Sequence, residues 1–452
     1  MTRPPWTEAP LDHAMRAHPH PPSPAMHIVV GPSLQRQAWR DFQTSPDWRS
    51  EDFDALVASD NPGAVFFEIQ TAINGLYRLC DRQQSVLRGR LDSERLSEMH
   101  GQTEMRARWL AVCADGARLH LTALEQREID IGLLRWIRRA GCLTCVVGAG
   151  VTMDAGGPSW PALVRALLHT SLLGATGPGA TGTPAVTPAQ AHRASEIVRA
   201  IEAGQADTDM LMEGAELCVT VRGQHLFADI TSLLYADGRQ PGQVHRAIAA
   251  LAAPLHVRER GGSVTGWAAV ISYNFDDLLG EAIDALGLAR SAYAMRGTQV
   301  AGDPNDLARA GGQHVLHQRI LHLHGYTPRR LFLLTHIPFV FSATQYSQGY
   351  GARRLPIVDQ AFTEYLDRPI FHAVYVGCSF SDQAMNGLLE TAARALPGRM
   401  HYALLRWPGP QPLAEATGSD CELHGATYLA MGVRPLWFEQ FDEIAGLINR
   451  LA

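Results

Sequence analysis

Short, nearly continuous apolar runs, separated by segments with helical spacing, make up most of the chain after residue 141. Such runs are typical of strands buried on both faces of a parallel sheet, whereas half-exposed strands alternate between polar and apolar residues. The helical segments between the runs would form the crossover connections. The pattern predicts an α/β fold with a Rossmann-like parallel sheet, with strands at residues 142–147, 267–272, 320–323, 339–342, 373–377 and 402–406.

The pattern before residue 127 is different. Residues 66–88 carry apolar side chains at helical spacing without an internal proline, so a helical accessory domain for sensing or oligomerisation is predicted at 26–126. Residues 1–25 are rich in proline and polar side chains, which bury little surface. We therefore predict a flexible tail that precedes a helical N-terminal domain.

The sheet domain is predicted at 127–452 and contains an interruption. A segment rich in glycine, threonine and proline begins at residue 174 and leads into helical patterns at about 188–204, 208–236 and 243–256. These helices separate the first predicted strand from the second. A helical insertion is therefore predicted at about 174–262.

Charge and composition exclude several classes of protein. The chain has 452 residues, a formal net charge of −6 and 39 basic residues, all of which are arginine. A chain without an overall basic charge is not predicted to bind nucleic acid directly. The absence of lysine excludes a P-loop ATPase, a lysine Schiff base and the strand lysine of protein kinases. A preference for arginine codons explains this composition.

The chain is expected to be a reduced, cytoplasmic protein. No apolar stretch approaches the roughly 18 residues of a membrane span, and no apolar core of a secretory signal is present near the start. Seven cysteines are an odd number and do not suggest a disulfide framework. The single Cys-x-x-Cys, Cys142 to Cys145, lies in a predicted strand and has no second pair, so no metal site is predicted.

The sharpest motif is Gly148-Ala149-Gly150, which directly follows the first predicted strand. Glycines at such a turn let backbone N–H groups approach a pyrophosphate, and a following helix N-terminus favours anions. The fingerprint of dehydrogenases is not met, because its third glycine would fall at Met153. Its ribose-binding acidic residue, expected about 20 positions further on, is also missing. We predict a dinucleotide loop that does not serve hydride transfer; an ordinary turn between strand and helix is the alternative.

Asn274 and Asp276 follow the strand predicted at 267–272. The carboxyl ends of parallel strands face the ligand crevice, so these side chains are candidates to bind ribose hydroxyls, a carboxamide or an ordered water. Asn and Asp are also common N-cap residues. The pair could therefore simply start the next helix.

His324 precedes Gly325 at the predicted exit of another strand. Histidine titrates near neutral pH and is the most frequent general base, so His324 is the candidate base of the site. His322, two residues earlier, is predicted to be a packed side chain.

A fourth motif follows the strand predicted at 373–377. Gly377 and Ser379 are candidates for contacts with the phosphate or ribose of an adenosine group. Ser381 or Asp382 would cap the following helix, and capping is the alternative interpretation of the whole turn.

Together and in this order, the four motifs resemble those of the sirtuin-like superfamily of NAD-consuming domains over about residues 127–452. Pro158-Ser159-Trp160 is also similar to the Pro-x-aromatic turn of that family. The resemblance implies that His324 is the catalytic base and that Asn274 orients the nicotinamide ribose or a water. It further implies an NAD-binding set of Gly148, Ala149, Gly150, Thr152, Pro158, Trp160, Asp276, Gly377 and Ser379.

Two departures from the protein-deacylating sirtuins narrow this resemblance. The four-cysteine zinc module is missing, and Pro161 stands where those enzymes have an arginine. The chain resembles the zinc-free bacterial proteins that hydrolyse NAD to nicotinamide and ADP-ribose when a phage is sensed. This resemblance implies a metal-free NAD hydrolase of abortive infection, as a homo-oligomer with a protein partner or a phage-derived trigger. A zinc-free NAD-dependent deacylase and a non-catalytic sensor of NAD or ADP-ribose are the alternatives.

Overall fold

The computed structural model describes residues 122–139, 141–173, 186–257, 262–296, 299–302, 318–329, 340–350, 355–367, 371–395 and 401–452. The predicted tail lies outside the described residues. The predicted accessory domain also lies outside them, except for its last residues, which begin helix α6 (Ala123–Arg139). Gly141 follows this helix, with a φ of +69° and a backbone N–H that donates to the carbonyl of Arg138, as is common where helices end.

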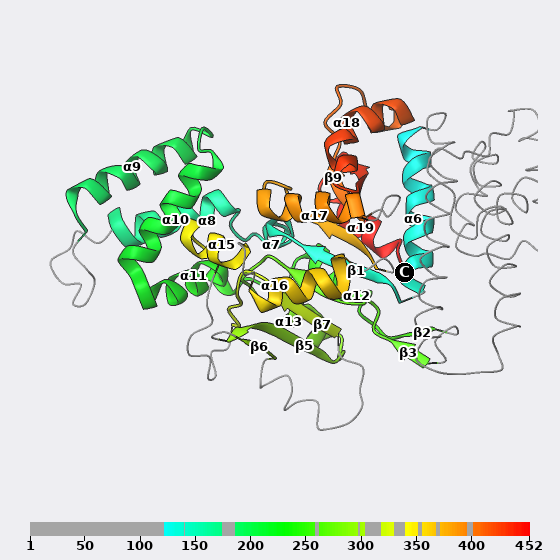
Figure 1. Cartoon of the computed structure of the whole chain (residues 1–452), viewed down its shortest axis with the longest axis horizontal. Coiled ribbons are helices and arrows are strands. Elements are labelled where there is room, and N and C mark those ends of the chain that lie inside the picture. Colours follow the sequence, from blue (N-terminus) through cyan, green and yellow to red (C-terminus); the bar gives the residue numbers. More distant parts are fainter. Residues whose placement is uncertain are drawn as a thin grey trace, which may run out of the picture.

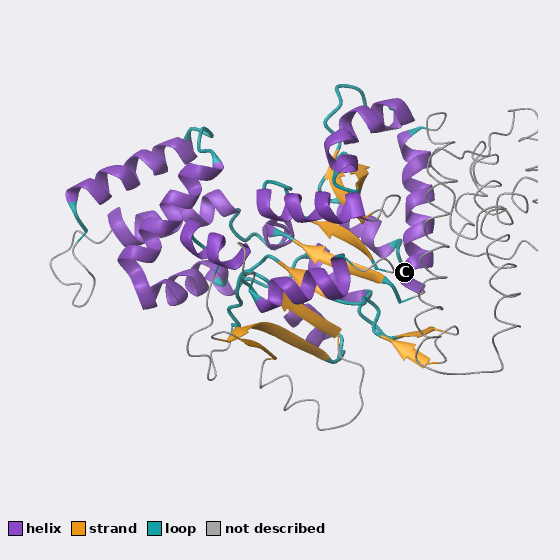
Figure 2. Ribbon diagram, viewed as in Figure 1, coloured by secondary structure: helices purple, strands orange, loops and turns teal. Residues whose placement is uncertain are grey.

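An eight-stranded sheet forms the centre of the described structure (Figure 2). Every pair of neighbouring strands is parallel except the last two, β5 and β6, which form an antiparallel edge. The predicted Rossmann-like parallel sheet is therefore confirmed. In spatial order the strands are β10 (Val433–Phe438), β9 (His401–Arg406), β8 (His372–Val376), β1 (Leu143–Val147), β4 (Val270–Ser272), β7 (Gln318–His322), β5 (Arg290–Arg296) and β6 (Gln299–Gly302).

Helices cover both faces of this sheet and bury two separate core clusters. Side chains of β1 alternate between the clusters, since Cys145 and Val147 lie in one and Val146 lies in the other. The first cluster is closed by α6, α12 (Gln243–Ala250), α13 (Leu278–Ala285) and α19 (Glu443–Asn449). The second is closed by α16 (Pro356–Ala361), α17 (Gln383–Ala395) and α18 (Gly418–Ala430). Burial on both faces explains why the central strands read as continuous apolar runs.

A third core cluster lies among helices beside the sheet (Figure 1). It is built from α8 (Trp160–Leu168), α9 (Pro188–Glu202), α10 (Thr208–Arg222) and α11 (Leu226–Leu234). The single helix predicted at 208–236 is wrong, because the chain turns at Gly223 with a φ of +49°. The helix predicted at 243–256 ends at Ala250, and as α12 it packs on the sheet.

Two differences from the predicted strands have clear physical reasons. No strand forms at residues 340–342. Phe341 is buried there in the third cluster, where its ring packs against Trp160 with 4.9 Å between centroids. The sequence pattern did not reveal β10, which contains Pro435. Proline is tolerated there because β10 is the outermost strand and pairs only with β9.

The remaining elements are short. They are α7 (Ala149–Asp154), α15 (Ala343–Tyr350) and the hairpin of β2 (Leu255–Val257) with β3 (Gly262–Val264). Turns of π-helix continue α8 at His169–Leu173 and α16 at Phe362–Leu366, and 3₁₀ turns lie at Gly223–His225, Ala236–Gly238 and Leu413–Glu415. Among the described helices, none has the length and apolar character needed to cross a bilayer.

Candidate active site

Four strands end at the same level of the sheet. Val147 of β1 pairs with Ser272 of β4 and with Val376 of β8, and Ser272 pairs in turn with His322 of β7. Because these strands are parallel, the segments that follow them leave from one edge, which is where ligands bind in open α/β sheets. The predicted motifs at 148–150, 274–276, 322–325 and 377–379 therefore meet at this carboxyl edge.

The glycine loop packs backbone to backbone against the segment after β8. The N–H of Gly148 donates to the carbonyl of Val376, and that of Gly150 donates to the carbonyl of Gly377, each over 2.9 Å. A Cβ atom on Gly148 would lie 2.6 Å from the Gly377 oxygen, and one on Gly150 would lie 2.7 Å from the Gly377 Cα. Gly377 itself has a φ of +67°, which favours glycine. These three glycines are needed for the contact between the two loops.

Asn274 joins the segment after β4 to the glycine loop. Its side-chain Nδ2 donates to the carbonyl of Gly148 over 2.9 Å, and the residue is 8% exposed. Its backbone N–H donates to the hydroxyl of Ser272 over 3.1 Å. The capping alternative does not hold for Asn274, because α13 begins at Leu278 and its N-cap position is Asp277.

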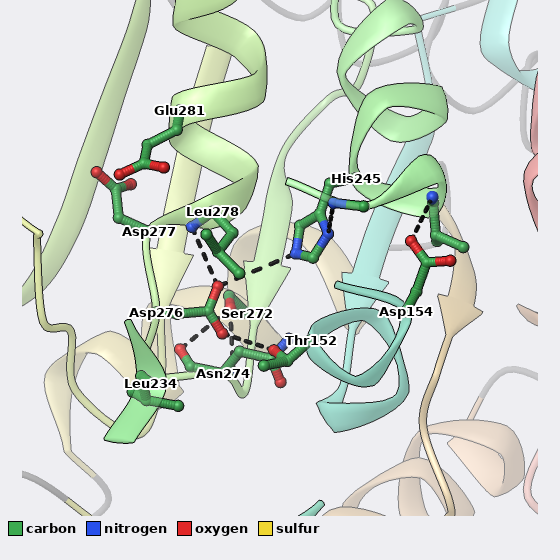
Figure 3. Close-up of polar contacts among 12 residues, drawn as sticks. Thr152, Asp154, Leu234, His245, Ser272, Asn274, Asp276, Asp277, Leu278 and Glu281 are labelled. Atoms are coloured by element: carbon green, nitrogen blue, oxygen red, sulfur yellow. Dashed lines mark hydrogen bonds and ion pairs between the residues drawn. The ribbon is translucent and has the colours of Figure 1, made fainter. Parts of the chain in front are cut away.

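Asp276 caps α13 and also holds Thr152 of α7 (Figure 3). Its Oδ1 accepts from the N–H of Leu278 over 3.1 Å, and its Oδ2 accepts from the Thr152 hydroxyl over 2.5 Å. Both side chains are buried, which strengthens a charge-assisted hydrogen bond. The capping interpretation holds for Asp276 only in that it binds the first N–H of α13 from the position before the N-cap, Asp277. Its contact with Thr152 joins the segments after β1 and β4 again.

The neighbouring carboxylate, Asp277, has a different partner. It forms a bidentate ion pair with the buried guanidinium of Arg290, whose two terminal nitrogens lie 3.0 and 2.9 Å from the carboxylate oxygens. Its backbone N–H donates to the hydroxyl of Tyr235 over 2.7 Å. Asp277 therefore fixes the start of α13 on β5.

His245 belongs to the site and was missed by sequence reasoning. It lies in the first turn of α12 and is 1% exposed. Its Nδ1 accepts from the N–H of Gly242 over 3.2 Å, and its Nε2 lies 4.0 Å from Asp276 Oδ1. Burial lowers the pKa of His245, although Asp276 and Asp154 act to raise it. The spacing from Gly242 to His245 could have indicated the helix cap. No local sequence signal indicates that His245 lies near the Asp276 carboxylate.

His322 is a packed side chain, as its position predicted. Its Nδ1 lies 3.2 Å from the carbonyl of Asn274, and its ring lies 4.4 Å from that of Tyr326. Burial lowers the pKa of His322 to about 4, so the ring is neutral at neutral pH. Its contact with Asn274 fixes the backbone of the β4 loop.

His324 emerges beside the β4 loop and keeps part of its surface exposed. Its ring lies edge-on to Tyr273, 5.0 Å between centroids, and is also near Phe275 at 6.4 Å and Tyr346 at 6.3 Å. These surroundings remove water from the ring, and desolvation lowers the pKa of His324 to about 4. At neutral pH the ring is uncharged, which is the form that can accept a proton.

The Pro158-Ser159-Trp160 turn starts α8. Ser159 is the N-cap, and its hydroxyl accepts from the N–H of Ala162 over 3.3 Å. Trp160 packs on Phe341, which in turn lies 6.0 Å from Phe275. This turn is therefore connected to the His324 side of the site through aromatic rings rather than through polar contacts.

The turn after β8 is more exposed than the other three. The Ser379 hydroxyl lies 2.7 Å from that of Ser381, and both residues are exposed. Asp382 accepts from the N–H of Met385 over 2.8 Å and also from the hydroxyl of Tyr346 on α15. The capping alternative thus holds for Asp382, whereas the Ser379 side chain is exposed to solvent.

The cysteines in the described part of the chain are all unlinked, and four of the five are buried. Within the described ranges, no group of three His, Cys, Asp or Glu side chains could hold a metal ion. Cys142 and Cys145 are both buried, unlinked members of the first core cluster. Burial raises the pKa of Cys378, beside the glycine loop, to about 12, so its thiol stays protonated.

The comparison with protein families agrees with this geometry. The family model of the SIR2-like domain matches residues 268–424, a range that includes Asn274, Asp276, His324, Gly377 and Ser379. The chain contains a SIR2-like domain. The matched range runs from the segment before β4 into α18. The glycine loop precedes the matched range but packs directly on Gly377 within it. No curated protein matches the chain significantly.

A SIR2-like domain is consistent with an NAD-dependent enzyme. The N–H groups of Gly148 and Gly150 and the Asn274 Nδ2 donate to the carbonyls of Val376, Gly377 and Gly148, so they hold the loops together. The Asn274 Oδ1 and the exposed Ser379 hydroxyl are groups that suit a ribose.

Proposed function

We propose that this chain is an NAD+ glycohydrolase that cleaves the nicotinamide–ribose bond to give nicotinamide and ADP-ribose. The observation that supports it most is the fixed position of Asn274. Its Nδ2 donates to Gly148 over 2.9 Å, and His324 leaves the sheet from the neighbouring strand β7. The amide lies on the glycine loop, and the neutral imidazole lies near Tyr273 and Phe275, which flank Asn274 in the sequence.

The chemistry needs little more than these groups. The bond to nicotinamide breaks through an oxocarbenium-like state, as in glycoside hydrolysis, and nicotinamide leaves as a neutral base. Water adds to the ribose carbon and loses one proton, so the products are nicotinamide, ADP-ribose and H⁺. Asn274 would orient that water or a ribose hydroxyl, since its Nδ2 is already bound and its Oδ1 can accept a hydrogen bond. His324 would accept the proton.

The other predicted residues would bind NAD. The loop of Gly148, Ala149 and Gly150 would border the pyrophosphate together with Gly377, with the N–H groups of Gly148 and Gly150 holding the loop in place, and Ser379 would contact the adenosine side. Asp276, aligned by Thr152, would meet the carboxamide, and Pro158 and Trp160 would border the nicotinamide end. We further propose that NAD loss serves anti-phage defence, with the segment at 26–126 as the accessory domain.

The first test compares purified full-length protein with its His324→Ala and Asn274→Ala variants. We expect the wild type to release nicotinamide and ADP-ribose from NAD, and each variant to be at least about 100-fold slower, since general base catalysis contributes about that much. His192→Ala is the matched control, because that side chain is 73% exposed on α9. Full activity of both site variants in folded protein would show that the assignment is wrong.

The same experiment separates the alternatives. An NAD-dependent deacylase would release acyl-ADP-ribose from an acylated peptide, whereas a silent sensor would bind NAD and leave it intact. Measuring cellular NAD during phage challenge tests the defence role, and a constant NAD level in challenged cells would contradict it.

A further inference from the structure

The first turn of α12 contacts both loops of the site. His245 approaches Asp276 of the β4 loop, and the N–H of Val244 donates to Asp154 Oδ2, at the end of the glycine-loop helix, over 2.8 Å (Figure 3). Gly242 packs so tightly there that a Cβ atom on it would lie 2.1 Å from the Asp154 carboxylate. Helix α12 therefore sets the spacing between the segments that follow β1 and β4.

The orientation of the His245 ring is fixed by the helix cap. Since Nδ1 accepts from the N–H of Gly242, a neutral ring must carry its proton on Nε2. That N–H lies on the Asp276 side, at 4.0 Å from Oδ1, which is just beyond direct hydrogen-bond distance. At 1% exposure the ring cannot touch a substrate itself.

We propose that His245 is a positioning residue of the NAD site and acts through Asp276. This inference rests on the proposed function. The carboxylate of Asp276 is surrounded by the Thr152 hydroxyl, the Leu278 N–H and the Nε2–H of His245, which lie on three different elements. A donor on the α12 side keeps the carboxylate from rotating away from Thr152.

The consequence for NAD follows from the chain connection between Asp276 and Asn274. Asp276 lies only two residues after Asn274, whose amide is bound to Gly148. If the carboxylate rotates, the β4 loop shifts, and the amide loses its place on the glycine loop. We expect the ribose and carboxamide of NAD to bind less tightly in that state.

The charged groups around His245 agree with a neutral ring. Asp276, Asp154 and Glu281 act to raise its pKa and Arg246 acts to lower it, while burial lowers it most. His322 is neutral as well, since burial lowers its pKa to about 4. A neutral ring has a single N–H, so the direction of that N–H determines which group His245 can donate to.

Two substitutions distinguish between the two contacts of the His245 ring. One is the hydrogen bond that Nδ1 accepts from the Gly242 N–H, and the other is the N–H that Nε2 directs toward Asp276. In His245→Asn the amide can still accept from the Gly242 N–H but is too short to reach Asp276. In His245→Gln an amide nitrogen can take the place of Nε2. Titration calorimetry with NAD should show about 10-fold weaker binding to the Asn variant, because the Asp276 carboxylate loses the polar N–H that lies 4.0 Å away. The Gln variant should recover to within about threefold, and both variants should melt within about 3 °C of wild type.

The outcomes distinguish this inference from the proposed function. Wild-type protein that binds no NAD would overturn the proposed function. Wild type that binds NAD, with an Asn variant that binds it equally well, would overturn the positioning role alone. Equal loss of binding in the Asn and Gln variants, with a large drop in melting temperature, would show that His245 is only structural. His192→Asn, on the exposed face of α9, controls for the substitution itself.

Discussion

The surroundings of His324, the proposed base, determine the pH range in which it could accept a proton. Aromatic rings around it lower its pKa to about 4, compared with about 6.5 for a solvated histidine. A base works only when unprotonated, so a lowered pKa moves the acid limb of the activity profile to lower pH. The same desolvation that keeps the ring neutral also makes it a weaker base than a solvated histidine.

We therefore predict that kcat/KM for NAD hydrolysis stays level from pH 8 down to about pH 5 and falls only below it, because kcat/KM reports the pKa of the free enzyme. The measurement is an initial-rate profile, with melting temperature recorded at each pH to exclude acid unfolding. Half-maximal activity near pH 6.5 would mean that a solvated histidine, and not His324, is the base.

At the scale of elements, the contact between the glycine loop and the segment after β8 holds the site together. Gly148 has a φ of −116°, which any residue adopts, so an added methyl group would cost energy through its contacts and not through backbone strain. The Cβ would lie 2.6 Å from the Gly377 oxygen and 2.9 Å from the Cys378 Cα, both of which are backbone atoms.

Gly148→Ala should lower the free energy of unfolding by about 1–3 kcal/mol, the usual cost of overpacking, and should weaken NAD binding. Gly387→Ala is the matched control. That glycine lies on the exposed side of α17 with no atom within 4 Å of its added Cβ, so alanine there should stabilise the protein by up to about 1 kcal/mol. Urea unfolding of both variants tests this, and equal stability of the two would contradict the steric argument.

At the scale of the whole molecule, the proposed function raises the question of what would keep an NAD hydrolase inactive at rest. An enzyme that is always active would exhaust the NAD of its own cell, so we propose that the N-terminal segment or the oligomer holds the site closed. Helix α6 itself belongs to the sheet domain. The N–H of Ala123 donates to the carbonyl of Ala416, and Arg127 donates to the carbonyl of Trp437 and pairs with Glu443.

A chain that begins at Thr122 therefore keeps these contacts and should remain folded. We predict that it hydrolyses NAD at least several-fold faster than the full-length protein without any trigger. Nicotinamide release at equal concentrations of folded protein is the measurement. Unchanged activity would rule out inhibition by residues 1–121.

The local pattern of apolar residues was sufficient to predict much of this protein's fold. Strands β1, β8 and β9 were predicted from the sequence because burial on both faces leaves a continuous apolar run in each. The glycine loop, Asn274 and His324 were found because each follows such a run, and parallel strands bring their carboxyl ends to one edge. Backbone periodicity and strand direction determine these features, and both are written in short stretches of sequence.

The tertiary structure alone decided the rest. Val340 and Phe341 are buried without forming a strand, because the rings of Trp160 and Phe275, both far away in the sequence, pack against Phe341. His245 reaches Asp276 only because α12 packs on the sheet, and Asp276 meets Thr152 only because β1 and β4 are neighbours. Sequence periodicity determines which side chains are buried, but contacts between residues far apart in the chain depend on how the elements pack. Those contacts hold the Asp276 carboxylate between Thr152 and the imidazole of His245.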